Sequence, residues 1–156
     1  MRNAIEYKDN FEKSVSIIEC HEGLADFENG ATEEDVRLAE DLLKIKFPSS
    51  YKKFLIKFGV GDFNGREFYG IVPGHVPGES APSAIWFTIS ERQENGLPNS
   101  MVVVASTGYG GLYCLDTSES SGGKAPVWIW DKRKIEKVAE DFSDFLLEEI
   151  TQSMLI

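Results

Sequence analysis

The amino-acid sequence predicts an α+β fold: a single, mostly antiparallel sheet of about four to six strands, with helices packed mainly on one face. Two observations lead to this prediction. A pair of amphipathic helices occupies residues 32–58, and three apolar segments of strand length follow one another within residues 101–130. Helices and strands that occur in separate runs, instead of alternating strictly, are typical of the α+β class.

The helical pair is predicted from its capping residues and from the spacing of its apolar side chains. The first helix begins after Thr32, whose hydroxyl can accept an amide N–H of the first turn, and acidic residues match the positive end of the helix dipole. A Phe47-Pro48 corner leads into the second helix, which ends at Gly59. The apolar residues of this second helix recur at helical spacing: Tyr51, Phe54, Leu55 and Phe58.

Three further helices are expected. Residues 1–22 carry apolar side chains at helical spacing, and residues 83–94 do so again before a Gly-Leu-Pro stop sequence. The chain ends in a helix whose buried face is expected to include the apolar residues of positions 142–150. The whole chain, residues 1–156, is predicted to be a single domain with its core in roughly residues 30–147.

Four strands are expected in the sheet. Residues 66–72 form a short strand between an Asn-Gly and a Pro-Gly sequence. Residues 101–105, MVVVA, are apolar on both faces, which is typical of a central strand. Residues 112–116 follow a glycine-rich turn and are the expected hairpin partner, and residues 127–130, VWIW, are the last strand.

Composition and charge restrict the classes of partner. Sixteen basic residues against 26 acidic ones give a net charge of -10, which disfavours nucleic acid and favours a basic protein partner. Residues 22–41 hold eight carboxylates and one arginine, either as a solvated surface or as an acidic binding face. The sequence lacks a signal peptide and any run of about 20 apolar residues, so a cytoplasmic protein without membrane contact is predicted.

A search for catalytic and metal-binding patterns predicts no enzyme. Residues 108–111 are rich in glycine but precede a strand, so no helix N-terminus is available there for a phosphate group. Cys114 could be paired with His21 or His75 as a nucleophile, but its place in the middle of a strand favours a buried structural role. The two histidines lack the spacing of a zinc site. No catalytic residue, metal or cofactor is therefore predicted.

The last predicted strand suggests a surface for a protein partner. Trp128 and Trp130 point to one face of the sheet and Val127 and Ile129 to the other. Either the two tryptophans lie exposed on the open face, where they would anchor a partner, or they pack under the terminal helix. The predicted partner-binding residues are these tryptophans and acidic residues near strand ends: Trp128, Trp130, Asp62, Asp116 and Asp131.

An ordered series of short motifs resembles the SUKH superfamily, which comprises bacterial immunity proteins related to a fungal regulator of cell-wall synthesis. The series spans roughly residues 30–147. The sequence departs from the family pattern at Phe47, where leucine is usual, and at residues 59–61, where Asn-Gly is usual. The matching motifs are Thr32-Glu33-Glu34 with Glu40, Phe47-Pro48-Ser49-Ser50-Tyr51 with Phe54-Leu55, Gly96-Leu97-Pro98, Leu115-Asp116-Thr117, Pro126-Val127 with Trp130-Asp131, and Phe142 with Phe145-Leu146.

The resemblance implies an α+β fold without catalytic activity. It also implies a function, because many bacterial members bind and neutralise a cognate toxin, often a nuclease. We therefore expect an immunity protein, or antitoxin, that binds a basic toxin domain of the nuclease type. The alternative is an adaptor for protein interactions in cell-envelope or stress regulation.

Overall fold

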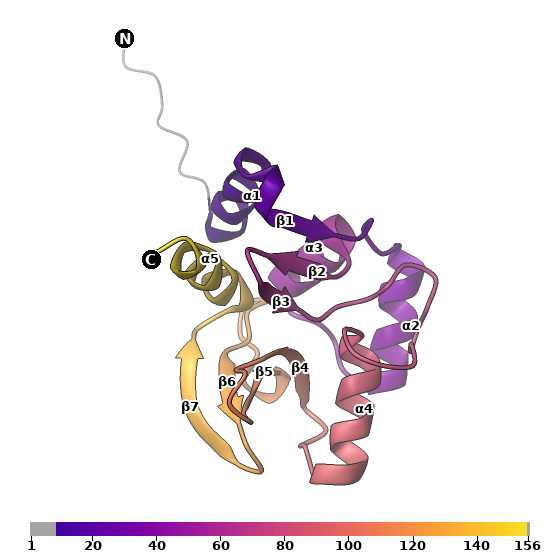
Figure 1. Ribbon diagram of the computed structural model, residues 1–156. Helices are drawn as coiled ribbons and strands as arrows, with labels where there is room; N and C mark the ends of the chain where they lie inside the picture. Colours follow the sequence, from indigo (N-terminus) through magenta and orange to yellow (C-terminus); the bar gives the residue numbers. More distant parts are fainter. Residues whose placement is uncertain (1–8, 156) are drawn as a thin grey trace.

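The computed structural model describes residues 9–155 and shows helices and strands in two groups (Figure 1). The helices are α1 (Asn10–Cys20), α2 (Glu33–Leu43), α3 (Ser49–Phe58), α4 (Ala84–Asn95) and α5 (Phe142–Ser153), with short 3-10 turns η1 (Glu22–Leu24) and η2 (Thr117–Glu119). The strands are β1 (Ala25–Phe27), β2 (Gly61–Phe63), β3 (Arg66–Phe68), β4 (Met101–Ser106), β5 (Leu112–Asp116), β6 (Val127–Trp130) and β7 (Lys134–Ala139).

The α+β class is confirmed, but the prediction of a single sheet is wrong. One antiparallel sheet has the strand order β1-β2-β3, and a second has the order β4-β5-β6-β7. A bulge in β4 between Val103 and Ala105 leaves Val104 outside the ladder with β5. The carbonyl of Val104 accepts a hydrogen bond of 2.8 Å from the amide of Tyr69, just beyond β3. The two sheets therefore touch through this contact without forming one continuous ladder.

Most of the predicted elements are present with shifted ends. The helices over residues 32–58, the helix over 83–94, the terminal helix and the three strands of 101–130 are confirmed. Of the predicted helix at residues 1–22, positions 1–8 lie outside the described residues, and α1 begins after Asp9, whose carboxylate accepts the amide of Glu12 at 2.8 Å. The predicted strand 66–72 is shorter, because β3 ends at Phe68. Strands β1, β2 and β7 were not predicted.

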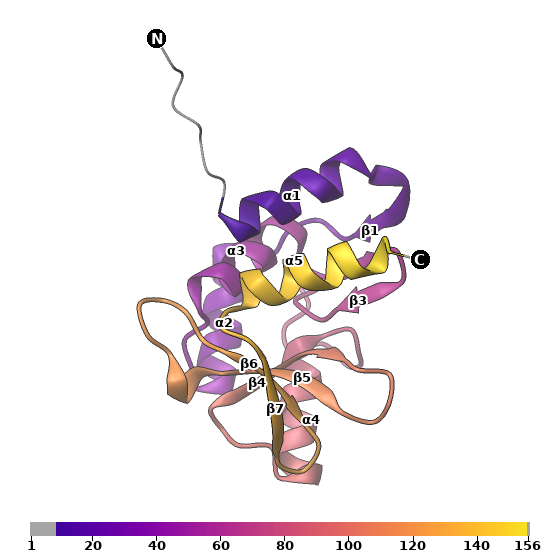
Figure 2. The same cartoon turned by 90° about the vertical axis from the view of Figure 1, so that its left-hand side faces the viewer.

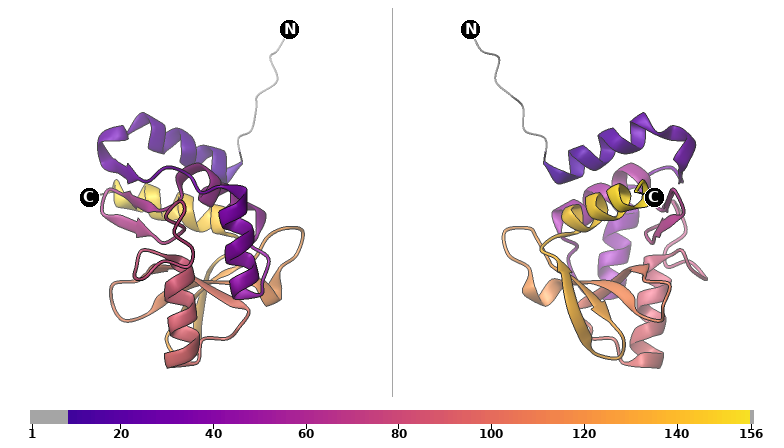
Figure 3. Two further views of the ribbon diagram at one scale, coloured as in Figure 1. Left: turned by 90° about the vertical axis from the view of Figure 1, so that its right-hand side faces the viewer. Right: turned by 60° about the vertical axis from the view of Figure 1, so that its left-hand side comes forward.

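Aromatic rings fill the space between the helices and the three-stranded sheet. Phe54 of α3 is completely buried, and its ring centroid lies 6.1 Å from Phe27 of β1, 6.1 Å from Phe68 of β3 and 5.3 Å from Phe142 of α5. One side chain thus contacts elements from the beginning, middle and end of the chain. α1 lies alongside α5 (Figure 3).

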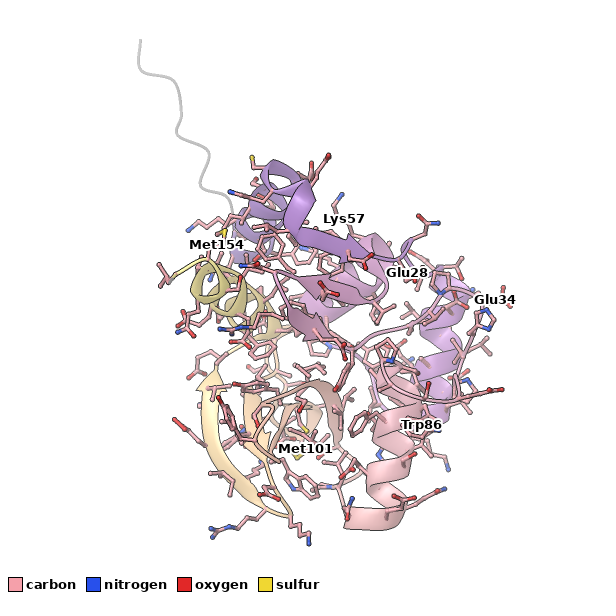
Figure 4. All side chains as sticks on the ribbon, viewed as in Figure 1. Glu28, Glu34, Lys57, Trp86, Met101 and Met154 are labelled. Atoms are coloured by element: carbon pink, nitrogen blue, oxygen red, sulfur yellow. The ribbon has the colours of Figure 1, made fainter. Side chains whose placement is uncertain are left out.

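The four-stranded sheet packs against α4 and α5. The hydroxyl of Thr88 on α4 accepts the amide of Val103 at 2.9 Å, and the ring of Phe145 on α5 lies 4.8 Å from Tyr113 on β5. Side chains fill the space between α4 and the sheet, where Met101 is completely buried (Figure 4). β7 forms the outer edge of this sheet (Figure 1), and five of its six residues are exposed.

The corner between α2 and α3 depends on a buried carboxylate. Glu40 is only 4% exposed, and its carboxylate accepts the backbone amide of Phe47 at 2.8 Å. The ammonium groups of Lys46 and Lys52 both lie 3.9 Å from Glu40. This arrangement satisfies a buried backbone N–H that follows the last turn of α2.

We expect Glu40→Met to lower the free energy of unfolding by about 2 kcal/mol, because the buried amide of Phe47 would lose its acceptor. Glu40→Gln is the matched control, since glutamine keeps an oxygen that can accept the same amide. Urea denaturation measures both variants. Equal losses of stability for the two substitutions would show that the hydrogen bond is not what stabilises the corner.

Candidate protein-interaction surface

A two-residue turn places two carboxylates opposite each other in the three-stranded sheet. Asn64 and Gly65 connect β2 to β3 and have φ angles of 49° and 83°, as two-residue hairpin turns require. This turn pairs Phe63 with Arg66 and, one step further from the turn, Asp62 with Glu67. The Asn-Gly sequence therefore sets the position of both acidic side chains.

The third strand adds another carboxylate to the same line. Asp26 of β1 pairs directly with Asp62. Because alternate residues of a strand point to opposite faces, Asp26, Asp62 and Glu67 share one face, and Phe63 and Phe68 share the other. The two phenylalanines are buried at 0% and 1% exposure, so the three carboxylates lie on the outer face. We call Asp26, Asp62 and Glu67 the acidic row.

The acidic row opposes folding electrostatically. Directly opposed side chains in a sheet have Cβ atoms about 4.5–5.5 Å apart, and like charges at that distance are destabilising. Within residues 9–155, no basic group lies within ion-pair distance of the row. Arg66, on the same strand as Glu67, instead forms an ion pair of 3.0 Å with Glu149 on α5. The negative charge of the row is therefore not neutralised by an ion pair among the described residues.

The row does not have the geometry of a metal site. Among the residues that the structure describes, no group of three or more histidine, cysteine or carboxylate side chains is placed to hold a metal ion. The arrangement is suited instead to an extended basic surface, where several cations face several carboxylates.

The two tryptophans of β6 do not form an exposed pair. Trp130 is only 4% exposed and belongs to the core, whereas Trp128 is partly buried. β6 pairs with β5 in an unbroken register, and the two irregularities in its pairing with β7 fall at extra residues of β7, Ile135 and Val138, so side chains still alternate along β6. Val127 and Trp130 therefore lie on opposite faces of the sheet and both are buried, so neither face is fully open at β6.

Trp128 and Asp116 belong to a buried ion-pair cluster. Asp116 is 1% exposed and forms an ion pair with Lys134 of β7, whose ammonium nitrogen also lies 4.8 Å from the ring centroid of Trp128. Burial acts to raise the pKa of Asp116, but hydrogen bonds from Lys134 and Ser118 outweigh it, so the pKa of this carboxyl is lowered. These contacts join β5 to β7, so Asp116 has a structural role.

Asp131 and Asp62 lie on different sheets. Asp131 is exposed in the turn between β6 and β7, beside a hollow of about 280 Å³ that Trp130 and Lys132 also line. Asp62 is half-buried in the middle of the acidic row. The structure therefore does not bring the five predicted residues together, and it gives Asp62 two acidic neighbours, Asp26 and Glu67, that sequence reasoning missed.

Cys114, the only nucleophile considered from the sequence, is a core residue. It is completely buried in β5, and burial raises the pKa of its thiol, with further contributions from Glu91 and Asp116. His21 and His75 are exposed and lie on other elements. The side chain of Cys114 therefore packs in the core.

Comparison with known families identifies the scaffold. A family model described as SUKH_6, SMI1-KNR4 cell-wall, matches residues 33–146, which is more than half of the chain. The chain belongs to this family. The region that matches the SUKH family model extends from α2 to the first residues of α5. It includes Asp62 and Glu67 but not Asp26.

SUKH membership fits an immunity-protein-like role without catalysis. None of the helices within residues 9–155 has the length and apolar character needed to cross a membrane. The acidic row and the family assignment are independent observations, because one comes from strand register and the other from the matched sequence.

Proposed function

We propose that this SUKH protein is an immunity protein that binds and neutralises a cognate toxin domain of the nuclease type, and that the acidic row contacts the toxin's basic surface. The observation that carries the proposal is the register that aligns Asp26, Asp62 and Glu67 on one outer face. An inhibitor that covers a phosphate-binding surface needs carboxylates in such an arrangement.

The energetics of the row support a binding role. Three aligned carboxylates without a cation cost stability in the free protein, and a basic partner would turn that repulsion into attraction. The net charge of -10 acts in the same direction, since it accelerates encounter with a positively charged domain. A surface that disfavours folding and favours a basic partner is more readily explained by binding than by stability.

The proposal predicts opposite effects on folding and on binding for one variant. With the row neutralised as Asp26→Asn, Asp62→Asn and Glu67→Gln, we expect the free energy of unfolding to rise by about 0.5–1 kcal/mol, because the repulsion is removed. The affinity for the cognate toxin domain, to be sought in the product of the neighbouring gene, should fall at least about tenfold at low salt. Urea denaturation and calorimetric titration measure the two quantities, and co-expression with the toxin measures protection of cells.

The matched control neutralises three exposed carboxylates elsewhere and so changes the net charge equally. These are Glu79 in the loop before α4, Glu94 on α4 and Glu136 on β7. Their substitution by glutamine should leave toxin binding within about twofold of the original value. If both triple variants bind equally well, the row is not the contact surface. If the neighbouring gene product is harmless to cells, the adaptor alternative replaces the immunity role.

A further inference from the structure

An apolar groove with positive charges along it lies on the outer face of α3. Ile56 is 39% exposed and lies among three lysines on this face. The outer face of α3 therefore combines an exposed apolar side chain with three cations, in a chain whose net charge is -10. The residues of α3 that point away from the core are exposed and recur at helical spacing: Ser49, Lys52, Lys53, Ile56 and Lys57.

Neighbouring elements turn this helix face into a groove. A hollow of about 620 Å³ with a mainly apolar wall lies against Ile56 and is also lined by Phe11 of α1 and Phe47 of the corner before α3. A smaller hollow of about 110 Å³ lies between α2 and α3 and shares Lys52 and Ile56 with the larger one. We call the joint surface of the two hollows the α3 groove. Its principal residues are Phe11, Phe47, Lys52, Lys53, Ile56 and Lys57.

The positive charges of the α3 groove are available to a ligand. Among the residues that the structure describes, Lys53 has no ion pair. The ion pairs of Lys52 with Glu40 and of Lys57 with Glu19 are long, at 3.9 Å each. Both lysine side chains are 47% exposed, so a carboxylate from a partner can reach them.

The α3 groove and the acidic row lie on opposite sides of two packed layers. The inner face of the three-stranded sheet packs on α3, where Phe27 and Phe68 contact the buried Phe54. The acidic row is on the outer face of the sheet, and the groove is on the outer face of α3. Figure 2 shows α3 and strand β1 toward opposite ends of α5. A ligand on one face therefore does not cover the other.

The chemistry of the α3 groove matches an acidic polypeptide segment that carries an apolar side chain. The apolar side chain would fill the larger hollow, and carboxylates beside it would face the lysines. Glu33 is the exposed carboxylate in the lining, so the local charge is positive. Acidic residues elsewhere on the protein act weakly on a short ligand, because salt screens charges beyond about 10 Å.

Other occupants complement the α3 groove less well. A nucleic acid or an anionic membrane would extend over the rest of the surface, where the net charge of -10 repels it. A second copy could present its acidic row, but that row consists of carboxylates alone and has no apolar side chain for the hollow. Residues 1–8 of this chain contain two basic residues and one acidic residue, so their charge does not complement the lysines.

We propose that the α3 groove binds an acidic segment of a partner protein. An apolar side chain of that segment packs on Ile56 and enters the larger hollow, and its carboxylates pair with Lys53 and Lys57. This inference goes beyond the proposed toxin contact, because it requires a ligand of the opposite charge on the opposite face. The protein can hold this second ligand while the acidic row is occupied.

Titrations of the full chain with short blocked peptides, followed by amide NMR shifts, test the groove. The first peptide has leucines at helical spacing separated by glutamates. The second has lysines in place of the glutamates, and the third has alanines in place of the leucines. We expect the first peptide to shift the amides of Ile56 and Gly123 saturably, with a dissociation constant below about 1 mM. The second should leave both amides unchanged, and the third should bind at least about tenfold more weakly.

Two substitutions test the mechanism of binding. Ile56→Ala removes the apolar contact, and Lys53→Met removes a charge but keeps the apolar stem of the side chain. Each should weaken binding of the first peptide about threefold or more. The matched controls are Leu42→Ala on α2, where the leucine is 47% exposed, and Lys137→Met on β7. Neither residue lines the groove, so both controls should bind the peptide unchanged.

Several results would overturn the proposal. Absence of any shift by the first peptide, or equal binding of the glutamate and lysine peptides, would show that the groove does not select an acidic segment. Stronger shifts of these amides by a single-stranded oligonucleotide or by phosphatidylglycerol vesicles would assign the groove to another class of ligand. Self-association in analytical ultracentrifugation that Ile56→Ala abolishes would assign it to a second copy.

The two proposals fail separately. The variant with the neutralised acidic row should bind the first peptide as tightly as the original protein, because the row lies on the opposite face. Loss of toxin binding by that variant, or failure to find a toxin, leaves the peptide result standing. Loss of peptide binding by Ile56→Ala and Lys53→Met with toxin binding intact supports a second, independent site.

Discussion

Replacement of Phe54 by alanine is expected to lower the free energy of unfolding by about 3–5 kcal/mol, the range typical of removing a buried aromatic ring. Phe54 is completely buried and contacts Phe27, Phe68 and Phe142, which belong to β1, β3 and α5. The cavity would therefore open at the point where three parts of the chain meet. Because Phe68 and Phe142 are themselves buried in the core, they cannot easily move to fill the cavity.

The matched control for Phe54 is Ile56→Ala on the same helix. Ile56 is 39% exposed, so its truncation creates no enclosed cavity, and the loss should be about 1 kcal/mol or less. Guanidinium or urea denaturation followed by tryptophan fluorescence measures both variants. If both lose similar stability, the packing of α3 depends on helix propensity more than on the aromatic cluster.

The second large effect is expected at the buried ion pair of β7. Lys134→Met should lower the free energy of unfolding at pH 7 by about 3 kcal/mol, because Asp116 would stay buried without its cation. The value is at the low end for buried pairs, since the Lys134 side chain is 35% exposed. Lys137→Met is the control on the same strand: its pair with Glu140 is exposed, and its loss should cost about 0.5 kcal/mol.

The effect of Lys134→Met should depend on pH. Asp116 has a lowered pKa in the folded protein, so its contribution to stability is full above the unfolded value of about 3.9 and is lost as pH falls through the folded pKa. Asp116 raises the pKa of Lys134, whose contribution is therefore lost only at alkaline pH. The difference between the two proteins should shrink from pH 7 to pH 3. A constant difference would contradict the ion-pair explanation.

The helices could be predicted because their signals are local. The capping box of α2, in which Thr32 and Asp35 bond each other's amides at 3.1 and 3.0 Å, is visible in four consecutive residues. The apolar spacing of α3 likewise needs no knowledge of its partners. The strands within residues 101–130 are apolar enough to be recognised in the same way.

The sheets could not be predicted to the same degree, because strand pairing is not local. β1 and β2 have only three residues each, which is too short for a periodic signal, and β7 is an exposed edge strand without an apolar face. β4 carries a bulge at Val104, whose carbonyl accepts the amide of Tyr69 just beyond β3, and no residue type in that apolar segment indicates a bulge or this contact. The single sheet was therefore a reasonable prediction and a wrong one.

The candidate site was partly within reach of the sequence. Asn64-Gly65 is a strong signal for a two-residue hairpin, and applying it would have placed Asp62 opposite Glu67. Asp26 could not have been added, since its pairing with Asp62 joins segments 36 positions apart. The prediction for the tryptophans of β6 failed for a different reason: it assumed one open face of the sheet, whereas Val127 on one face and Trp130 on the other are both buried.

The position of β1 has a consequence for how partners could change during evolution. β1 is the edge strand of its sheet and lies before residue 33, where the match to the SUKH family begins. The acidic row thus combines two carboxylates of the family scaffold with one from a flanking segment. If the acidic row binds the partner as proposed, substitutions in β1 would alter recognition without changing the matched scaffold, and related chains would diverge in specificity at this strand.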